Sequence, residues 1–282
     1  MRRRRDSGIE IKNTPQLLRM RRAGLVVARA LTVMEDAVTV GMTTAEVDAI
    51  AVEVLAEAGA TSSFLGYAPG GVAPYPAVTC VSVDDEVVHG IPSSERVLAD
   101  GDLLSIDFGA LLDGYHGDAA RTVEIGAVSP EAHRLVADTH EALWAGIAAA
   151  RLGSRIGDIS AAVEESLRSH DTRYGIVKEF TGHGIGTAMH QEPSIPNYGR
   201  AGRGPVIRTG MALAIEPMVT LGTNRVAILD DDWTVVTTDG SWAAHWEHTI
   251  TVTDRGVWVL TAEDGGEELL GRHGIPFGPL AD

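Results

Sequence analysis

The amino-acid sequence predicts an α+β fold in which one helix-and-strand unit occurs twice, with approximate two-fold symmetry, around one sheet. Two sets of matches between the halves predict the duplication. Residues 101–107 and 210–216 share a Gly-x-x-Leu-x-Ile-acid pattern, and residues 41–55 resemble residues 153–167 at an offset of 112 residues. Because no linker separates the halves, we expect one domain with one sheet core.

Helices are expected where apolar residues recur at helical spacing. Thr14 and Pro15 favour the start of the first helix, as N-cap and first helical residue. Thr43 and Glu46 form a capping-box pattern that begins the second helix, and Gly59 ends it. Two more helices are expected in the second half, between residues 129 and 153 and around residues 159–167.

Strands are expected where apolar and polar residues alternate. The expected strands cover residues 78–83, 101–125, 212–219, 247–252 and 257–260. Gly and Pro residues make the segment 68–76 a loop. Residues 1–10, with arginines at 2–5, are expected to form a disordered basic arm, and the polar residues 263–282 a peripheral tail. The folded domain is therefore expected to span residues 11–262.

The segment 101–121 predicts a β-hairpin that carries two carboxylates. Asp113-Gly114 favours a type I′ turn, since both central residues of that turn need a positive φ. With the turn placed there, Gly109 lies opposite Asp118. Asp107 and Asp118 then point to the same face as diagonal neighbours. Two carboxylates that close repel each other unless a proton or a cation lies between them.

Composition excludes several classes of protein. The net charge is −16, which argues against general binding to DNA, RNA or anionic membranes. No apolar run approaches the roughly 18 residues of a membrane span. The one cysteine, Cys80, excludes an internal disulfide and a cysteine-based zinc cluster. We therefore expect a cytoplasmic globular protein that binds neither DNA nor membrane.

The duplication predicts a metal centre on the two-fold axis. It would bring together Asp107 and Asp118 from one half with Glu216 and Glu247 from the other, beside His183 on a glycine-flanked turn. Carboxylates that converge inside a folded core need cations to stay ionised. Four oxygen donors and one nitrogen suit one or two divalent ions such as Mn, Fe, Co or Zn. Such a site activates water for hydrolysis, with phosphoester, amide and peptide bonds all open as substrates.

The ordered motifs resemble those of type I methionine aminopeptidases over about residues 11–260. The motifs are His89-Gly-Ile-Pro, Ile106-Asp107, Asp113-Gly-x-His-Gly-Asp118, Thr181-Gly-His-Gly-Ile-Gly186, His190-x-Glu-Pro193, Ile215-Glu-Pro217 and Glu247-His-Thr249. The resemblance implies the pita-bread fold, a pseudo-two-fold unit with a central antiparallel sheet and outer helices. It also implies removal of the initiator methionine from nascent chains when the second residue is small.

The resemblance further implies a role for each metal-site residue. Asp107 would chelate one divalent ion, Asp118 and Glu247 would bridge two ions, and His183 and Glu216 would hold the other. Glu216 would also accept a proton from the bridging water. The two ions could be Co, Mn, Fe, Zn or Ni.

Two further histidines and an apolar pocket complete the implied site. His190 would donate a hydrogen bond to the scissile carbonyl or its oxyanion. His89 would orient the substrate or pass a proton. Matching positions for the methionine pocket are Phe64, Tyr67, Tyr75, Cys80, Met189 and Trp233. The segment 68–74 is longer than is usual in the family, and His245 stands where glutamine is common.

Two alternative functions remain open from the sequence. A related pita-bread peptidase, such as an Xaa-Pro aminopeptidase or prolidase, would share the metal ligands, although such enzymes usually carry an additional N-terminal domain. A non-catalytic binding protein on the same fold would tend to lose ligands, and here all five are present. For the methionine aminopeptidase hypothesis we expect a monomer that acts on N-terminal Met peptides of nascent chains, with transient ribosome contact.

Overall fold

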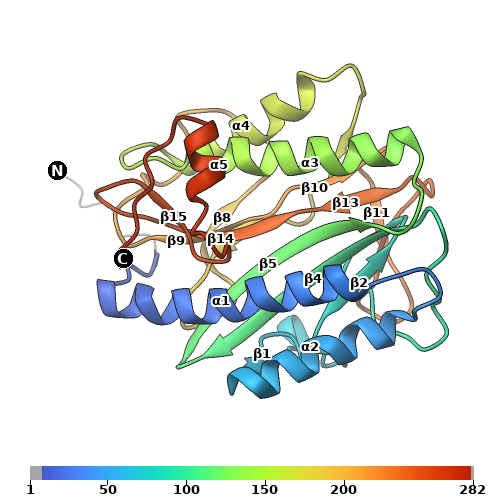
Figure 1. The fold of residues 1–282 in the computed structure, drawn as a ribbon. Helices are drawn as coiled ribbons and strands as arrows, with labels where there is room; N and C mark the ends of the chain where they lie inside the picture. The colour runs from blue at the N-terminus through green and yellow to red at the C-terminus, as the bar shows by residue number, and fades with distance from the viewer. Residues whose placement is uncertain (1–7, 281–282) are drawn as a thin grey trace.

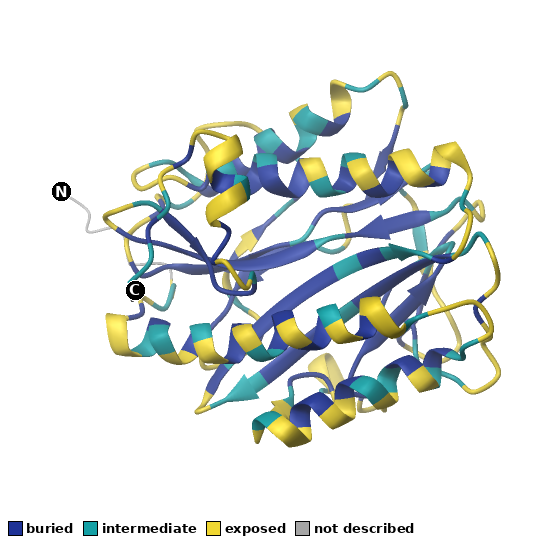
Figure 2. Ribbon diagram, in the orientation of Figure 1, coloured by how far each residue is buried: buried dark blue, intermediate teal, exposed yellow. Residues whose placement is uncertain are grey.

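The computed structural model describes residues 8–280 and has a large antiparallel sheet with helices on its outer face (Figure 1). The helices are α1 (Thr14–Ala37), α2 (Thr44–Ala58), α3 (Pro130–Ala149), α4 (Ile156–Arg168) and α5 (Glu267–Arg272), with a short 3₁₀ turn at Pro69–Gly71. Strand interiors are buried, and the helices expose only the faces turned away from the sheet (Figure 2). Within the described residues no helix is long and apolar enough to cross a membrane.

The nine-stranded sheet shows the expected two-fold pattern. Its order is β1-β4-β5-β14-β9-β7-β8, and β2 and β15 pair with β4 and β14. The strands are β1 (Thr61–Ser62), β2 (Cys80–Val83), β4 (Leu103–Leu112), β5 (Tyr115–Glu124), β7 (Gly182–Gly184), β8 (Gln191–Ile195), β9 (Ala212–Ile215), β14 (Glu247–Val252) and β15 (Val257–Val259). The central pair β5–β14 is flanked by β4 and β2 on one side and by β9 and β7 on the other. This arrangement is the pseudo-two-fold α+β architecture that the sequence predicts.

Two small sheets complete the fold beside the large one. One has the order β13-β10-β6 and the other β11-β12-β3. Their strands are β3 (Glu86–Val88), β6 (Gly175–Ile176), β10 (Met218–Thr220), β11 (Val226–Ile228), β12 (Val235–Thr237) and β13 (Ala243–His245). The strand expected over 212–219 is therefore two strands in different sheets. Pro217 separates them, because proline has no N–H to continue a ladder.

The predicted hairpin is confirmed in its turn and its register. Asp113 and Gly114 have φ of 51° and 78°, as a type I′ turn requires. Gly109 pairs with Asp118 in the β4–β5 ladder. Ile106 and Phe108 belong to the apolar cluster formed with α1 and α2, so the alternating residue Asp107 faces the opposite, inner side of the sheet.

The helix starts are confirmed with one correction. The N-cap of α1 is Asn13, not Thr14: its Oδ1 accepts the Gln16 N–H at 3.0 Å, and Gln16 Oε1 accepts the Asn13 N–H at 2.8 Å. Asn caps a helix at least as well as Thr, and only Asn13 has a glutamine three residues later to complete a capping box. The capping box of Thr43 and Glu46 is present as predicted.

The first and last described segments of the chain pack against the rest of the fold. Residues 1–7 of the expected basic arm lie outside the described residues. Glu10, at its end, accepts a hydrogen bond from Gln191 Nε2 at 2.6 Å. At the other end, Leu270 on α5 and Ile275 are buried in the apolar cluster beneath α3. The segment after residue 262 therefore covers part of the core, although its polar composition does not indicate this.

Candidate metal centre

Strand register places three acidic residues in adjoining positions on the inner face of the sheet. Asp107 on β4 pairs with Ala120 on β5, and Ala120 pairs with Glu247 on β14. Asp118 lies two residues before Ala120 on the same strand and so shares its face. Asp118 and Glu247 are buried, and Asp107 is half-buried. The pairing of three strands thus brings together acids that are up to 140 residues apart in the chain.

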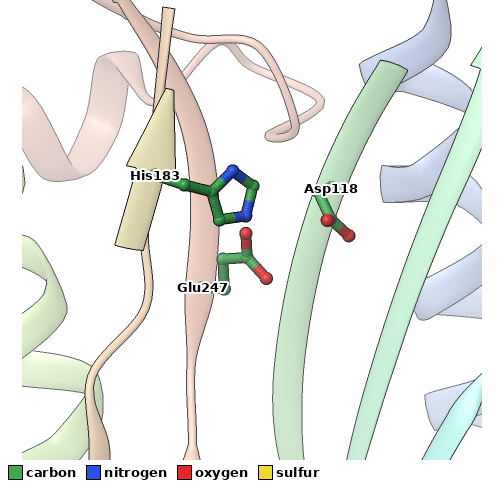
Figure 3. A group of neighbouring side chains, drawn as sticks. All are labelled: Asp118, His183 and Glu247. Carbon is green, nitrogen blue, oxygen red and sulfur yellow. The ribbon is translucent and has the colours of Figure 1, made fainter. Parts of the chain in front are cut away.

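His183 and Glu216 approach the same point from the other half of the sheet. His183 on β7 pairs with Ala214 on β9, and Glu216 follows two residues after Ala214. His183 Nε2 lies 3.4 Å from Glu216 Oε1. Figure 3 shows His183 and Glu247 turned toward Asp118, and ligand atoms of these three residues lie within 4.8 Å of one another.

His183 lies on a short strand and not on the turn that its flanking glycines suggest. β7 runs between β8 and β9, and the glycines let these strands approach closely. A Cβ at Gly182 would collide with the Ala214 carbonyl, and one at Gly184 with the Glu192 carbonyl. His183 Nδ1 lies 3.0 Å from the Gly184 carbonyl oxygen, to which it donates. This bond leaves the Nε2 lone pair directed at the carboxylates.

Burial gives the titratable groups of the centre unusual pKa values. Desolvation raises the pKa of Asp107, Glu216 and Glu247 well above the ordinary values, and neighbouring carboxylates raise them further. Burial also raises the pKa of Asp118 to about 7. In the opposite direction, burial lowers the pKa of His183 to about 3, so its imidazole is neutral. The carboxylates need a positive partner that the imidazole does not provide.

The residues present fit divalent cations as that partner. Asp107 Oδ1, Asp118 Oδ1 and Glu247 Oε1 are buried without any hydrogen-bond partner. Buried carboxylate oxygens are rarely left unpaired unless they bind an ion. The donor set of carboxylate oxygens and one neutral imidazole nitrogen suits ions of intermediate hardness. The described residues supply no cysteine thiolate to this group, since Cys80 lies in the apolar pocket beside it.

The carboxylates line a pocket that also has an apolar and aromatic side. The cavity has a volume of about 310 Å³, and Asp107, Asp118, Glu216 and Glu247 lie in its lining. The structure brings together every residue that was assigned to the methionine pocket: Phe64, Tyr67, Tyr75, Cys80, Met189 and Trp233. The Tyr75 and Trp233 rings meet edge to face at 5.1 Å, and Trp233 Nε1 donates to the Ala73 carbonyl at 2.9 Å.

The two further histidines, His89 and His190, also line this pocket. His89 has a φ of 62°, which is uncommon for a residue with a side chain, and its ring contacts Phe180 and Trp233. Burial lowers the pKa of His89 to about 4. The His190 ring is exposed to the open cavity with its centroid 4.3 Å from that of His183. Both imidazoles can therefore meet a ligand that reaches the carboxylates.

The sequence reasoning missed four residues that also line the cavity. Glu179 and Phe180 directly precede the motif 181–186, Thr181 is the first residue of that motif but was given no role, and Pro69 comes from the long loop. Proximity to the motif is the signal that could have identified the first three.

The two histidines around Glu247 lie on different faces. His245 Nε2 lies 3.9 Å from Glu216 Oε2, next to the carboxylates. His248 points to the helical side of the sheet, where Nδ1 lies 2.9 Å from Thr261 Oγ1 and the ring contacts Trp144. His248 therefore makes no contact with the carboxylate centre.

A family model and individual relatives both match this chain to metallopeptidases. The profile of metallopeptidase family M24 matches residues 18–254. Methionine aminopeptidase 1 of Mycobacterium tuberculosis is 51% identical over 254 residues, which cover 89% of this chain and 94% of the relative. The methionine aminopeptidase of Clostridium acetobutylicum is 48% identical over 253 residues, covering 90% of this chain and 98% of the relative.

Solved structures agree with the sequence relatives. A methionine aminopeptidase from Thermotoga maritima superposes with a TM-score of 0.86 at 41% identity, covering 90% of this chain and 100% of that chain. The prolidase from Pyrococcus furiosus superposes with a TM-score of 0.68 at 23% identity, and 65% of that chain is covered. At that identity the second likeness shows a shared fold and nothing more.

Proposed function

The chain belongs to metallopeptidase family M24, and from this we propose that it hydrolyses the peptide bond after an N-terminal methionine. The substrates would be nascent proteins whose second residue is small. The observation that carries the proposal is that the carboxylates and His183 line the same cavity of about 310 Å³ as an apolar and aromatic cluster. Such a site holds an apolar side chain and presents the adjoining amide to the hydrolytic centre.

Two divalent ions would be held by the five residues that converge there. Asp107 would bind one ion, His183 and Glu216 the other, and Asp118 and Glu247 would bridge them. The unpaired buried oxygens of Asp107, Asp118 and Glu247 support this assignment. When bound, the ions would supply Lewis acidity and a water molecule of lowered pKa. The identity of the ions is open among Co, Mn, Fe, Zn and Ni.

Protein side chains would perform the proton transfer and stabilise the developing charge. Glu216 would accept the proton of the attacking water, since it lies beside His183 in the lining of the cavity. His190 would donate a hydrogen bond to the carbonyl oxygen as negative charge develops there. His89 would orient the peptide beyond the methionine or pass a proton.

The pocket chemistry fits a methionine side chain. Phe64, Tyr75 and Trp233 provide an aromatic wall, and the sulfur atoms of Cys80 and Met189 add polarisable surface. A thioether packs well against aromatic rings and against sulfur. Burial raises the pKa of Cys80 well above that of a free thiol, so Cys80 would act as an apolar contact and not as a nucleophile.

A substrate comparison tests the proposal against the prolidase alternative. The metal-loaded protein should release methionine from Met-Ala-Ser and leave Ala-Pro-Ala uncleaved. Glu216→Gln, with correct folding shown by circular dichroism, should slow the release at least about 10²-fold. Cleavage of Ala-Pro-Ala in preference to Met-Ala-Ser would favour the alternative function. No cleavage of either peptide with any divalent ion would support a binding protein.

The cellular setting follows from the same function. A monomer in the cytoplasm, with transient ribosome contact, would meet nascent chains as their N-termini emerge. The net charge of −16 supports an absence of general DNA and membrane binding.

A further inference from the structure

We propose that Tyr67 is a positioning residue that fixes which ring nitrogen of His190 carries the proton. The proposal rests on the proposed function, because it concerns the hydrogen bond that His190 gives to the substrate. The Tyr67 hydroxyl oxygen lies 2.7 Å from His190 Nδ1, and the two ring centroids are 5.3 Å apart. Within the described residues, this is the hydrogen bond that the His190 ring makes.

A neutral imidazole has one N–H donor and one acceptor nitrogen, so the partner of Nδ1 decides what Nε2 can do. If the phenol donates to Nδ1, the ring proton is on Nε2, which can then donate to a carbonyl oxygen. If Nδ1 instead carries the proton, Nε2 presents a lone pair that repels the same oxygen. Burial raises the pKa of Tyr67, so its hydroxyl keeps the proton that it would donate to Nδ1.

The backbone around Tyr67 holds the phenol independently of the loop tip. The Tyr67 N–H donates to the Phe64 carbonyl at 2.8 Å, and its own carbonyl accepts the Tyr75 N–H at 2.9 Å. A third bond joins the Gly66 N–H to the Tyr75 carbonyl at 2.8 Å. These bonds close the neck of the loop 68–74, so Tyr67 sits on its rigid end. A group held this way can preorganise its partner.

The His190 ring is placed so that its free nitrogen can serve the substrate. It lies tilted by 66° against the ring of His183, a proposed metal ligand, and it is exposed to the open cavity. Tyr67 approaches from the loop side and binds Nδ1. A peptide carbonyl held at the carboxylate centre would therefore meet Nε2, and Tyr67 would determine whether it meets a donor.

Substitution of Tyr67 by phenylalanine keeps the ring and removes only the hydroxyl. Tyr67→Phe should lower kcat on Met-Ala-Ser about 10-fold, the usual effect of losing a group that orients a functional histidine. The KM should change less than about 2-fold, since the apolar pocket keeps its ring. A purely structural or pocket role would instead raise KM or lower the stability.

Introducing Tyr67→Phe into a protein that already carries His190→Gln separates the effect of Tyr67 on the His190 ring from its other effects. The side-chain amide of His190→Gln offers an N–H donor near the position of Nε2 and does not depend on the phenol. Tyr67→Phe should therefore cost nothing further in the His190→Gln protein. Tyr75→Phe is the matched control, because the Tyr75 hydroxyl donates to the Thr79 and Gly90 carbonyls and not to His190. Its effect should be equal in the two backgrounds.

Nitrogen NMR of histidine-labelled protein reads the tautomer directly, with the His190 signals assigned by their loss in His190→Gln. The proposal expects Nε2–H in the wild type and a mixture of tautomers in Tyr67→Phe. An Nδ1–H tautomer in the wild type would overturn the proposal. So would a loss of kcat that is as large when Tyr67→Phe is added to His190→Gln as when it is added to the wild type. A wild type that cleaves no Met peptide would instead refute the proposed function, while the NMR result would still decide the tautomer.

Discussion

Replacing Asp118 by asparagine should stabilise the metal-free protein at alkaline pH, while removing a proposed bridging ligand. Burial raises the pKa of Asp118 from 3.8 to about 7. The folded state therefore binds a proton more tightly than the unfolded state. The contribution of protonated Asp118 to the free energy of unfolding is fully present below about pH 4. It falls as the pH rises toward 7 and is absent at higher pH.

The structure sets the size of this effect. A rise of roughly three pKa units corresponds to at most about 4 kcal/mol at pH 8, at about 1.4 kcal/mol per unit. The asparagine amide must itself be buried where Asp118 Oδ1 has no partner, which costs about 1–3 kcal/mol. We therefore expect Asp118→Asn to gain about 2 kcal/mol at pH 8 and to be less stable than the wild type at pH 4.

Urea unfolding in the presence of a chelator measures both values. Asp171→Asn removes the negative charge of an exposed loop carboxylate and is the matched control for the loss of one charge. Equal slopes of stability against pH for the wild type and Asp118→Asn would refute the reasoning. Such a result would mean that the carboxylate is already solvated or paired in the metal-free protein.

Three other substitutions test separate parts of the account. Glu216→Gln should lower kcat by at least about 10²-fold without changing the circular dichroism, and a full-speed variant would show that the proton-acceptor role is wrongly assigned. Burial raises the pKa of Asp84 to about 6, so stability should fall as the pH rises from about 4 to 6. Asp84→Asn keeps an acceptor for the Leu103 N–H. It should raise the free energy of unfolding, measured with urea, by at most about 3 kcal/mol at pH 7 and leave it unchanged at pH 3.5. Gly184→Ala should cost about 1–3 kcal/mol by overpacking against the Glu192 carbonyl, and an unchanged thermal midpoint would contradict the close strand approach.

Local sequence signals predicted the part of the fold that depends on neighbouring residues. The dipeptide Asp113-Gly114 determined the turn, the turn determined the register, and the register placed Asp107 and Asp118 on one face. The capping box at Thr43 was equally local. The error at the first helix arose because Asn13 and Thr14 are adjacent residues that both cap helices well, and only Asn13 has Gln16 at the right spacing.

Long-range pairing is what the sequence left undetermined. Tyr67 and His190 are 123 residues apart, and no periodicity connects them. Leu270 and Ile275 are buried because they pack against α3, which is distant in the sequence. The polar composition of their own segment therefore did not indicate it. The duplicated pattern did predict that acids from both halves would meet. It could not show that His183 lies on a strand, because glycines serve turns and close strand approaches alike.

Metal titration combined with a peptide assay tests the central claim most directly. Protein stripped with a chelator should be inactive, bind two Mn or Co ions per chain, and then release methionine from Met-Ala-Ser. The Asp107→Ala protein should bind fewer ions and release none. A stripped wild type that takes up no ion, or that is loaded with each divalent metal and releases no methionine, would contradict the account.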